Sequence, residues 1–230
     1  MGKIILFDLY DTLLRGIFFS FDSGLEYLYD HVFCSACTKQ MFDHYAKQMK
    51  PLYDQRAATN KEIFFIRQDY PFLCEKCHVK PVQDTPELEY QVMNSMQRSV
   101  LPDAVLAALK RLQDKHTKMY ILTNSIFSAN AQKRLLREFK IDGYFCDLFC
   151  SADFGYRKPD KRFFDYAVTN ILKENPDCTK KDIVFIGNDY RSDMHGAVLA
   201  GLQAIWYNIN HEENVDRLPI RQFADWDQIG

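Results

Sequence analysis

The sequence lacks the long hydrophobic runs and the one-sided charge that would point to a membrane or to nucleic acid. None of its apolar runs approaches the roughly 20 residues that a membrane-spanning helix needs. The formal net charge is only −2, so we expect no role in nucleic-acid or membrane-surface binding. Repeats, low-complexity tracts and flexible linkers are also missing. The hydrophobic content of 47% is that of an ordinary globular protein.

The sequence also offers no targeting signal that we recognise. An apolar run that we predict to be a strand begins at residue 3 and leaves no room for a signal peptide. We therefore expect a cytoplasmic protein. The seven cysteines are an odd number, and in a reducing compartment they do not suggest a disulfide framework. The length of 230 residues fits one large domain, or a core domain with one insertion.

Short apolar runs alternate with helical patterns along most of the chain. Strands are predicted at 3–9, 118–123, 144–150, 182–186 and 204–207. Helices are predicted between them at 102–115, 128–139, 161–172 and 193–200. This alternation predicts an α/β fold, a Rossmann-like, doubly wound parallel sheet with helices on both faces.

The segment 15–98 breaks this alternation. It has no apolar run comparable to the predicted strands, and helices are predicted at 25–50, 60–69 and 87–97. We interpret most of its many aromatic residues as the core of a helical unit rather than as a binding face. The sequence therefore predicts a core of residues 1–14 and 99–230, with a helical domain of residues 15–98 inserted after the first strand.

Two predicted strands end in side chains that suit anion chemistry. Asp8 follows the apolar run 4–7, which places its carboxylate where open α/β sheets bind their ligands. Thr123 and Asn124 end the strand 118–123. A hydroxyl and the backbone N–H groups there can donate hydrogen bonds to a phosphoryl oxygen. Taken alone, a Thr-Asn pair could equally be an ordinary helix cap.

Two further motifs bring charge. Lys158 precedes Pro159 at the start of a predicted helix, and its ammonium can offset negative charge at the site. Asp189 and Asp193 follow the strand 182–186, and hard carboxylate oxygens suit Mg²⁺. We prefer this pair because it keeps both carboxylates. The alternative pair replaces the first acid with Asn188.

Together and in this order, the four motifs resemble those of the haloacid dehalogenase (HAD) superfamily, whose first motif is an apolar run followed by Asp-x-Asp-Gly-Thr. The resemblance covers about residues 3–14 and 102–207. It implies that the helical insertion is a cap that closes over the active site. It also implies a Mg²⁺-dependent phosphatase that acts on a small phosphorylated metabolite through an aspartyl-phosphate. It implies no particular oligomeric state.

The resemblance gives each motif residue a role. Asp8 would be the nucleophile that attacks phosphorus, and Lys158 would be its catalytic cation. The residues that would hold the phosphoryl oxygens are Thr123, Asn124 and Lys158. The ligands of Mg²⁺ would be Asp8, the backbone carbonyl of Tyr10, Asp189 and Asp193.

The first motif departs from the family pattern. Tyr10 stands where family phosphatases have the acid that protonates the leaving oxygen, and Asp11 replaces the glycine. A free tyrosine titrates at about pH 10 and is a poor base at neutral pH. A general acid–base group is worth about 10²–10⁴-fold, so its loss should slow turnover without abolishing it for good leaving groups. The turn geometry decides whether Asp11 can enter the site.

Tyr10 leaves two alternatives open. The dehalogenase branch of the superfamily also has Tyr at this place, and a 2-haloacid dehalogenase would use Asp8 without metal. The other alternative is a catalytically weak member that binds a phosphorylated ligand or a partner. A cluster of carboxylates in a cleft is costly without a cation, so the acidic fourth motif favours the metal-dependent phosphatase.

The predicted cap contains two Cys-x-x-Cys pairs, Cys34 with Cys37 and Cys74 with Cys77. Four thiolates in such pairs are a common structural Zn²⁺ site. The long separation of the pairs and the helical pattern around the first pair favour thiols that simply pack in the core. Zinc in the cap is thus a hypothesis beside buried core cysteines.

Overall fold

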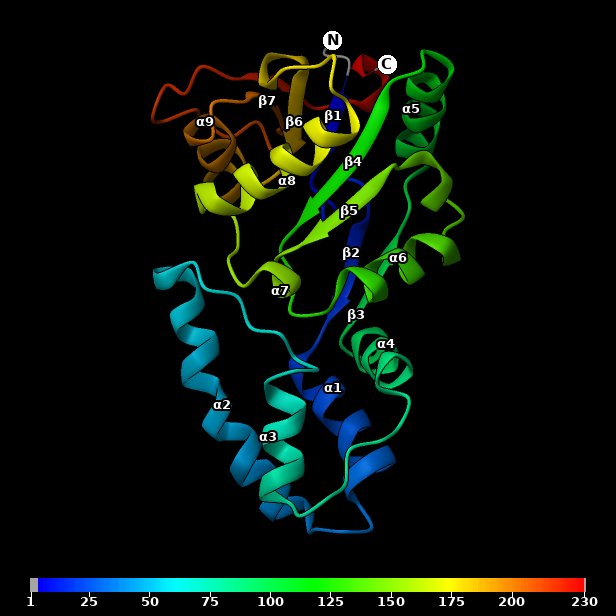
Figure 1. Ribbon diagram of the computed structural model, residues 1–230, viewed down its shortest axis with the longest axis vertical. Coiled ribbons are helices and arrows are strands. Elements are labelled where there is room, and N and C mark those ends of the chain that lie inside the picture. Colours follow the sequence, from blue (N-terminus) through cyan, green and yellow to red (C-terminus); the bar gives the residue numbers. More distant parts are fainter. Residues whose placement is uncertain (1–3, 230) are drawn as a thin grey trace.

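A computed structural model of the chain describes residues 4–229. It has a sheet part and a helical part (Figure 1). The sheet part carries a six-stranded parallel sheet, and the helical part, residues 21–96, lies beyond the carboxyl ends of its strands. The predicted α/β class, a parallel sheet flanked by helices, is confirmed. Residues 1–3, where we predicted the start of the first strand, lie outside the described residues.

The strand order in the sheet is β5-β4-β1-β6-β7-β8. The strands are β1 (Ile4–Phe7), β4 (Lys118–Thr123), β5 (Asp147–Cys150), β6 (Ile183–Gly187), β7 (Gln203–Tyr207) and β8 (Arg221–Phe223). β1 pairs with β4 on one side and with β6 on the other, so it is central. We did not predict β8, which has three residues and carries no apolar run.

The alternating side chains of β1 separate the two hydrophobic layers of the sheet part. Ile5 and Phe7 pack against one layer, and Ile4 and Leu6 against the other. Helices α5 (Asp103–Asp114) and α6 (Ala129–Glu138) contribute to the first layer, whereas α8 (Lys161–Glu174) and α9 (Gly196–Leu199) contribute to the second. Burial on both faces explains why β1 is apolar throughout. The short helical segments of the sheet part are Asp142–Tyr144, α7 (Ser151–Phe154), Lys180–Asp182, Tyr190–His195 and Trp226–Gln228.

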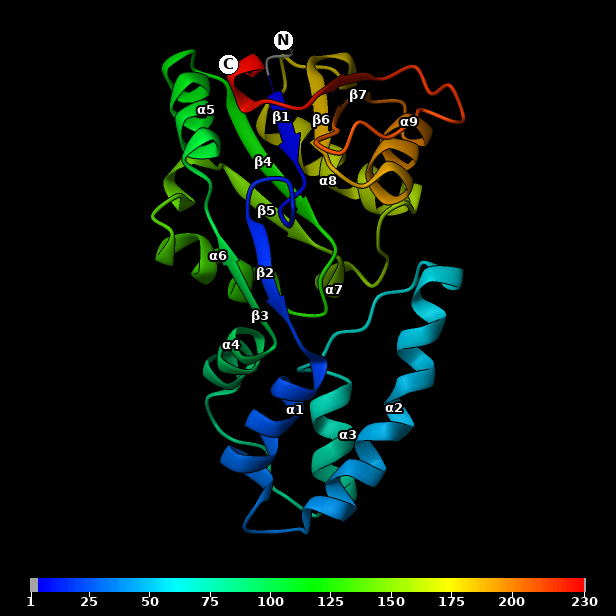
Figure 2. The same ribbon diagram turned by 180° about the vertical axis from the view of Figure 1, so that it is seen from behind.

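An antiparallel pair of strands joins the two parts, as Figure 2 shows from behind. It consists of β2 (Arg15–Phe19) and β3 (Gln97–Val100). The helices between them are α1 (Phe21–Leu28), α2 (Lys39–Thr59), α3 (Asp69–Lys76) and α4 (Thr85–Met96). The first predicted helix, 25–50, is therefore interrupted: a π-helical turn at Tyr29–Phe33 follows α1, and Thr38 caps a new helix.

The helix predicted at 60–69 is wrong, because most of this segment is extended or turned. Asn60 ends α2 in the left-handed conformation, with φ of 53°. The next residue, Lys61, bridges to Tyr156 of the sheet part. Pairing with a distant strand-like segment has thus overridden the local helical pattern.

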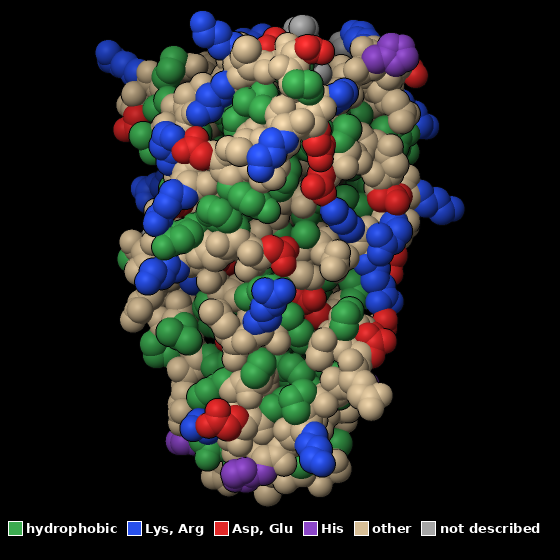
Figure 3. Space-filling model, in the orientation of Figure 1, with side chains coloured by type: hydrophobic (Ala, Val, Ile, Leu, Met, Phe, Trp, Pro, Cys, Tyr) green, Lys and Arg blue, Asp and Glu red, His purple; other side chains and the backbone are tan. Residues whose placement is uncertain are grey.

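The surface is of mixed charge. On the face drawn in Figure 3, Asp and Glu side chains lie among Lys and Arg side chains, which agrees with the net charge of −2. None of the helices in residues 4–229 has the length and apolar character needed to cross a membrane.

Candidate active site

β1 carries Asp8 to the edge of the sheet that faces the helical part. The backbone N–H of Asp8 donates to the carbonyl of Ile186 over 2.8 Å, which extends the ladder one residue beyond the strand. The chain then turns, and the N–H of Leu14 donates to the carbonyl of Leu9 over 2.9 Å. This turn brings Thr12 back beside Asp8, where its hydroxyl donates to Oδ2 over 2.9 Å.

Lys158 joins two carboxylates at this edge. Its Nζ donates to Oδ1 of Asp8 over 2.6 Å and to Oδ1 of Asp193 over 2.7 Å. All three side chains are buried. Burial works to lower the pKa of Lys158, but the carboxylates of Asp193 and Asp8 raise it above its ordinary value. Burial raises the pKa of Asp193 to about 7, although Lys158 lowers it. Lys158 is therefore a charged ammonium held against Asp8.

Close packing at the end of β6 sets the position of Asp193. A Cβ atom added at Gly187 would lie 2.4 Å from Oδ2 of Asp193. Only a glycine leaves room for the carboxylate to come this near to the strand. Gly187 is thus needed for packing, because a larger residue would displace Asp193 and with it the ion pair to Lys158.

The fourth motif uses Asn188 rather than Asp189 at the site. Oδ1 of Asn188 lies 3.0 Å from the Thr12 hydroxyl that also contacts Asp8. The Asp189 side chain is exposed and accepts a hydrogen bond from the N–H of Ser192 over 2.6 Å, so it caps the turn that follows. Our preference for the Asp189 pairing stays a prediction, and these contacts favour the alternative in which Asn188 precedes Asp193.

Thr123 and Asn124 have different surroundings. Thr123 is fully buried, and its hydroxyl has no hydrogen-bond partner within residues 4–229. An unsatisfied buried hydroxyl is costly, so this atom is available to a ligand. Asn124 is already engaged: it donates to the carbonyl of Lys158 over 3.0 Å and accepts from its N–H over 2.8 Å. Its side chain thus holds the Lys158 backbone with one N–H and its oxygen. A role of Asn124 in holding phosphate stays a prediction, for which the second amide N–H is the donor.

The Tyr10 hydroxyl is hydrogen-bonded on both sides. Its hydroxyl donates to Oε1 of Gln132 over 2.6 Å and accepts from Nε2 of Gln97 over 2.5 Å. Burial raises the pKa of Tyr10 further above its ordinary value of 10. The two glutamines were missed in the sequence, because nothing in their local pattern distinguishes them from other polar residues of helices and strands.

Asp11 does not take the place of the missing acid. It adopts a left-handed backbone conformation with φ of 59°. Its Oδ1 accepts a hydrogen bond from the N–H of Gly16 over 2.9 Å, and its side chain is exposed. The turn thus directs this carboxylate toward the start of β2.

A cavity of about 310 Å³ lies between the sheet part and the helical part. It adjoins the Asp8 group at Tyr10 and at Asn124, which is hydrogen-bonded to the Lys158 backbone. Its walls are Tyr10, Phe19, Phe21, Tyr53, Arg56, Met96, Gln97, Asn124, Ser125, Ile126 and Phe127. Aromatic walls with a few polar groups are typical of small-molecule sites.

The cysteines do not gather into the zinc site that we considered. Within residues 4–229, no group of three or more His, Cys, Asp and Glu side chains is arranged to hold a metal ion. The exposed Cys34 thiol donates to the carbonyl of Asp30 over 3.1 Å. Cys74 and Cys77 are buried, and burial, helped by a hydrogen bond with Cys37, raises the pKa of Cys77 to about 12. Thiols of this kind pack as neutral side chains, the alternative that the sequence left open.

Known proteins share this fold. A 2-haloacid dehalogenase from Pseudomonas syringae aligns over 99% of this chain and 96% of its own, with a TM-score of 0.68 and 21% identity. The HAD-hydrolase YfnB from Bacillus subtilis, in a form bound to magnesium, aligns over the same shares with a TM-score of 0.58 and 21% identity. At this identity the likeness concerns the fold alone.

The fold and the site together define a hydrolase on a Rossmann-like sheet. The family model of the haloacid dehalogenase-like hydrolases matches residues 3–201. The pyrimidine 5'-nucleotidase YjjG of Escherichia coli is 31% identical over 214 residues, which are 91% of this chain and 87% of the relative. The chain belongs to the haloacid dehalogenase-like hydrolase family, as the four motifs indicated.

Proposed function

We propose that this hydrolase is a phosphatase that acts on a small phosphate monoester through an aspartyl-phosphate on Asp8. The observation that carries the proposal is the buried carboxylate of Asp8 in contact with the Lys158 ammonium. The Thr123 hydroxyl, at the end of the neighbouring strand β4, has no hydrogen-bond partner within residues 4–229 and adds a donor. A nucleophile, a cation and a free donor are the parts that phosphoryl transfer requires.

The first step forms one bond and breaks one. A carboxylate oxygen of Asp8 attacks phosphorus, the ester P–O bond breaks, and the leaving oxygen departs as an alkoxide or phenoxide that takes its proton from water. Lys158 and the Thr123 hydroxyl stabilise the charge that develops on the phosphoryl oxygens. In the second step water attacks the aspartyl-phosphate, which releases phosphate and restores the carboxylate.

We propose that leaving-group protonation is the weak step. The Tyr10 proton is directed at Gln132, and the Asp11 carboxylate is directed at Gly16. Neither group therefore delivers a proton to the leaving oxygen in this arrangement. Aryl phosphates, whose leaving oxygens are weakly basic, should be the better substrates.

The oxygen donors around Thr12 fit a magnesium ion. The Thr12 hydroxyl has one proton but faces both Asp8 and Asn188, so one of these two oxygens is left to face a cation. We propose Asp8, the Tyr10 carbonyl and Asn188 as the protein ligands, with Asp193 holding Lys158. When bound, magnesium would neutralise charge on the transferring phosphoryl group. One carboxylate with substrate phosphate is a usual magnesium environment.

The cavity indicates the kind of alcohol that the substrate carries. Its aromatic walls, including Phe21 and Tyr53, suit a flat ring, and Gln97 and Arg56 offer hydrogen-bond donors. We therefore propose a nucleoside 5'-monophosphate with a pyrimidine base, the class that the name of the Escherichia coli relative indicates for that protein. Residues 15–98 would act as the cap that closes over it, and residues 1–14 and 99–230 as the core.

The test is phosphate release from p-nitrophenyl phosphate and from a pyrimidine nucleotide, with and without magnesium. We expect release from both esters in the native protein, more slowly from the nucleotide because its 5'-oxygen is the more basic leaving group, and loss of both in Asp8→Asn. Asp11→Asn is the matched control, because it changes a neighbouring carboxylate that is bound to the N–H of Gly16. Equal release by Asp8→Asn and the native protein would contradict the proposal.

One observation favours a second function. Tyr10 in the first motif leaves the site without a proton donor, and displacement of halide needs none. A 2-haloacid dehalogenase would form an ester on Asp8 and release halide. Chloride release from a 2-chloro acid that a chelator does not diminish would establish this function in place of phosphatase activity.

A further inference from the structure

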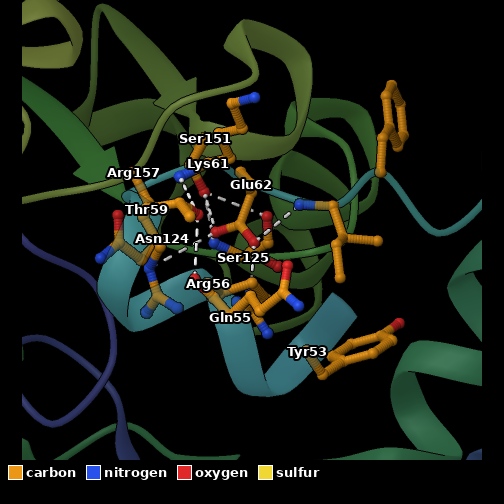
Figure 4. Close-up of polar contacts among 12 residues, drawn as sticks. Tyr53, Gln55, Arg56, Thr59, Lys61, Glu62, Asn124, Ser125, Ser151 and Arg157 are labelled. Carbon is orange, nitrogen blue, oxygen red and sulfur yellow. Dashed lines mark hydrogen bonds and ion pairs between the residues drawn. The ribbon is translucent and has the colours of Figure 1, made fainter. Parts of the chain in front are cut away.

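Glu62 is a buried carboxylate that connects the helical part to the sheet part. It lies just after α2, and its side chain is fully buried. Figure 4 shows Arg56, Ser151 and Arg157 around it. A buried carboxylate costs free energy unless several partners compensate it. Its partners therefore define what this residue does.

The two carboxylate oxygens of Glu62 have separate partners. Oε1 pairs with Nε of Arg56 at 2.7 Å and accepts the N–H of Ile63 over 3.0 Å, so it stays within the helical part. Oε2 accepts from the Ser151 hydroxyl over 2.8 Å and lies 3.8 Å from Nε of Arg157, both in the sheet part. One side chain thus bridges the two parts.

The backbone near Glu62 is joined to the same region. Its N–H donates to the carbonyl of Gly155 over 3.0 Å, and the N–H of Arg157 donates to the carbonyl of Asn60 over 2.9 Å. Lys61 bridges to Tyr156 between them. Segments 60–62 and 155–157 are therefore joined by one isolated antiparallel β-bridge.

The contact between Glu62 and segment 155–157 lies next to Lys158 in the chain and next to the cavity wall. Arg157 precedes Lys158, whose backbone is held on its other side by Asn124. Arg56 is one of the side chains that line the 310 Å³ cavity. Glu62 thus lies between a cation of the cavity wall and the loop that presents Lys158 to Asp8.

We propose that Glu62 is a positioning residue, which makes docking of the helical part and placement of Lys158 a single event. When the helical part is docked, Glu62 fixes the loop 155–157, and this loop sets the reach of Lys158. When it is undocked, the Lys158 loop loses these restraints, and Arg56 leaves the cavity wall. The inference rests on the proposed phosphatase function only where kcat and KM are used to test it.

A second ion pair between the parts provides the comparison. Glu87 of α4 pairs with Arg134 of α6 at 2.5 Å, and both side chains are well exposed. Such surface pairs contribute about 0–1 kcal/mol, and this one contacts neither Lys158 nor its loop. Glu87→Gln therefore removes an ion pair between the same two parts without touching the catalytic loop.

The experiment measures hydrogen exchange of peptides that cover 153–159, together with kcat and KM for p-nitrophenyl phosphate, in Glu62→Gln and Glu87→Gln. The amide variant keeps the shape and the hydrogen bond from Ser151 but loses the charge that holds both arginines. We expect faster exchange in 153–159 and a kcat lower by about 10- to 100-fold in Glu62→Gln. Glu87→Gln should change neither.

Ser151→Ala is the second variant, because it removes one contact of Glu62 and leaves its charge in place. It should give a smaller change of the same kind. If Glu62→Gln matches Glu87→Gln in both exchange and kcat, the inference is wrong. If the native protein releases no phosphate, the proposed function fails, whereas the exchange of 153–159 still decides the role of Glu62.

Discussion

The two sides of the candidate active site differ in the groups that they offer to a substrate. On the side of attack, Asp8, Lys158 and Asp193 are buried and joined by hydrogen bonds of 2.6 and 2.7 Å. The Thr123 hydroxyl at the end of β4 has no hydrogen-bond partner within the described residues. On the side of the leaving group, Tyr10 has its proton bound to Gln132. The residues on the first side match the motifs of the family. On the second side, Tyr10 stands where the family pattern has an acid.

This difference indicates that a site can retain the ion pairs of its nucleophile and yet lack the acid that protonates the leaving group. The ion pair of Lys158 is enclosed, and removal of either partner would leave an uncompensated buried charge. The Tyr10 position faces a cavity and forms hydrogen bonds between neutral groups. Substitution of Tyr10 removes hydrogen bonds between neutral groups and leaves no buried charge without a partner.

The largest expected effect comes from Tyr10→Asp. A carboxylic acid at this place should protonate the leaving oxygen and raise kcat/KM for alkyl phosphates by about 10²–10⁴-fold. The rate for p-nitrophenyl phosphate should change far less, because that leaving group needs no proton. The measurement is initial rates for both ester classes.

Tyr10→Phe is the matched control for this variant. It removes the hydroxyl and keeps the ring, so the alkyl phosphate rate should stay low and close to that of the native protein. A large loss of alkyl phosphate activity in Tyr10→Phe would show that the Tyr10 hydroxyl is itself the proton donor.

A smaller effect concerns the cavity wall on the leaving-group side. The Tyr53 hydroxyl donates to the buried carboxylate of Asp69. Burial raises the pKa of Asp69 to about 6, although Tyr53 and Arg56 lower it. The native state therefore binds this proton more tightly than the unfolded chain does. The resulting stabilisation is full below about pH 4 and is lost as the pH rises through about 6, a change of about 3 kcal/mol.

Asp69→Asn should remove this part of the pH dependence. Urea unfolding at about pH 4 and about pH 7 measures the free energy of unfolding of the native protein and of the variant. The free energy of unfolding of the variant, relative to that of the native protein, should be about 3 kcal/mol higher at the higher pH than at the lower one. The exposed Asp54 makes Asp54→Asn the control, and a native-like pH dependence in Asp69→Asn would contradict the assignment.

The smallest expected effect tests the ligands on the side of attack. Asn188→Asp adds a carboxylate beside Asp8, so magnesium should bind the protein without substrate about tenfold more tightly, or about 1.4 kcal/mol. Calorimetric titration with magnesium measures this directly. Asp189→Asn should leave the affinity unchanged, because Asp189 caps a turn. The reverse pattern would restore Asp189 as the ligand.

The sequence was a good guide to the sheet part and a poor guide to contacts between the parts. Runs such as 118–123 are apolar because both faces of the sheet are covered, so the pattern and the buried strand have one cause. The helix expected at 60–69 failed because Lys61 pairs with Tyr156, far away in the chain. No local pattern reports such a pairing.

The candidate site divides in the same way. The positions of Asp8, Thr123 and Lys158 followed from strand ends, because the carboxyl ends of parallel strands meet at one edge. The preference for Asn188 over Asp189 depends on the shape of a turn, which no local sequence pattern reports. The role of Asn124 and the contacts of Glu62 likewise depend on the fold of distant loops.

The measurement that tests the contrast between the two sides most directly is the dependence of kcat/KM on the pKa of the leaving alcohol, across aryl and alkyl phosphates. For the native protein we predict a steep fall in kcat/KM as that pKa rises, and for Tyr10→Asp a much shallower one. A native protein that hydrolyses alkyl and aryl phosphates at similar rates would contradict the proposed lack of a proton donor.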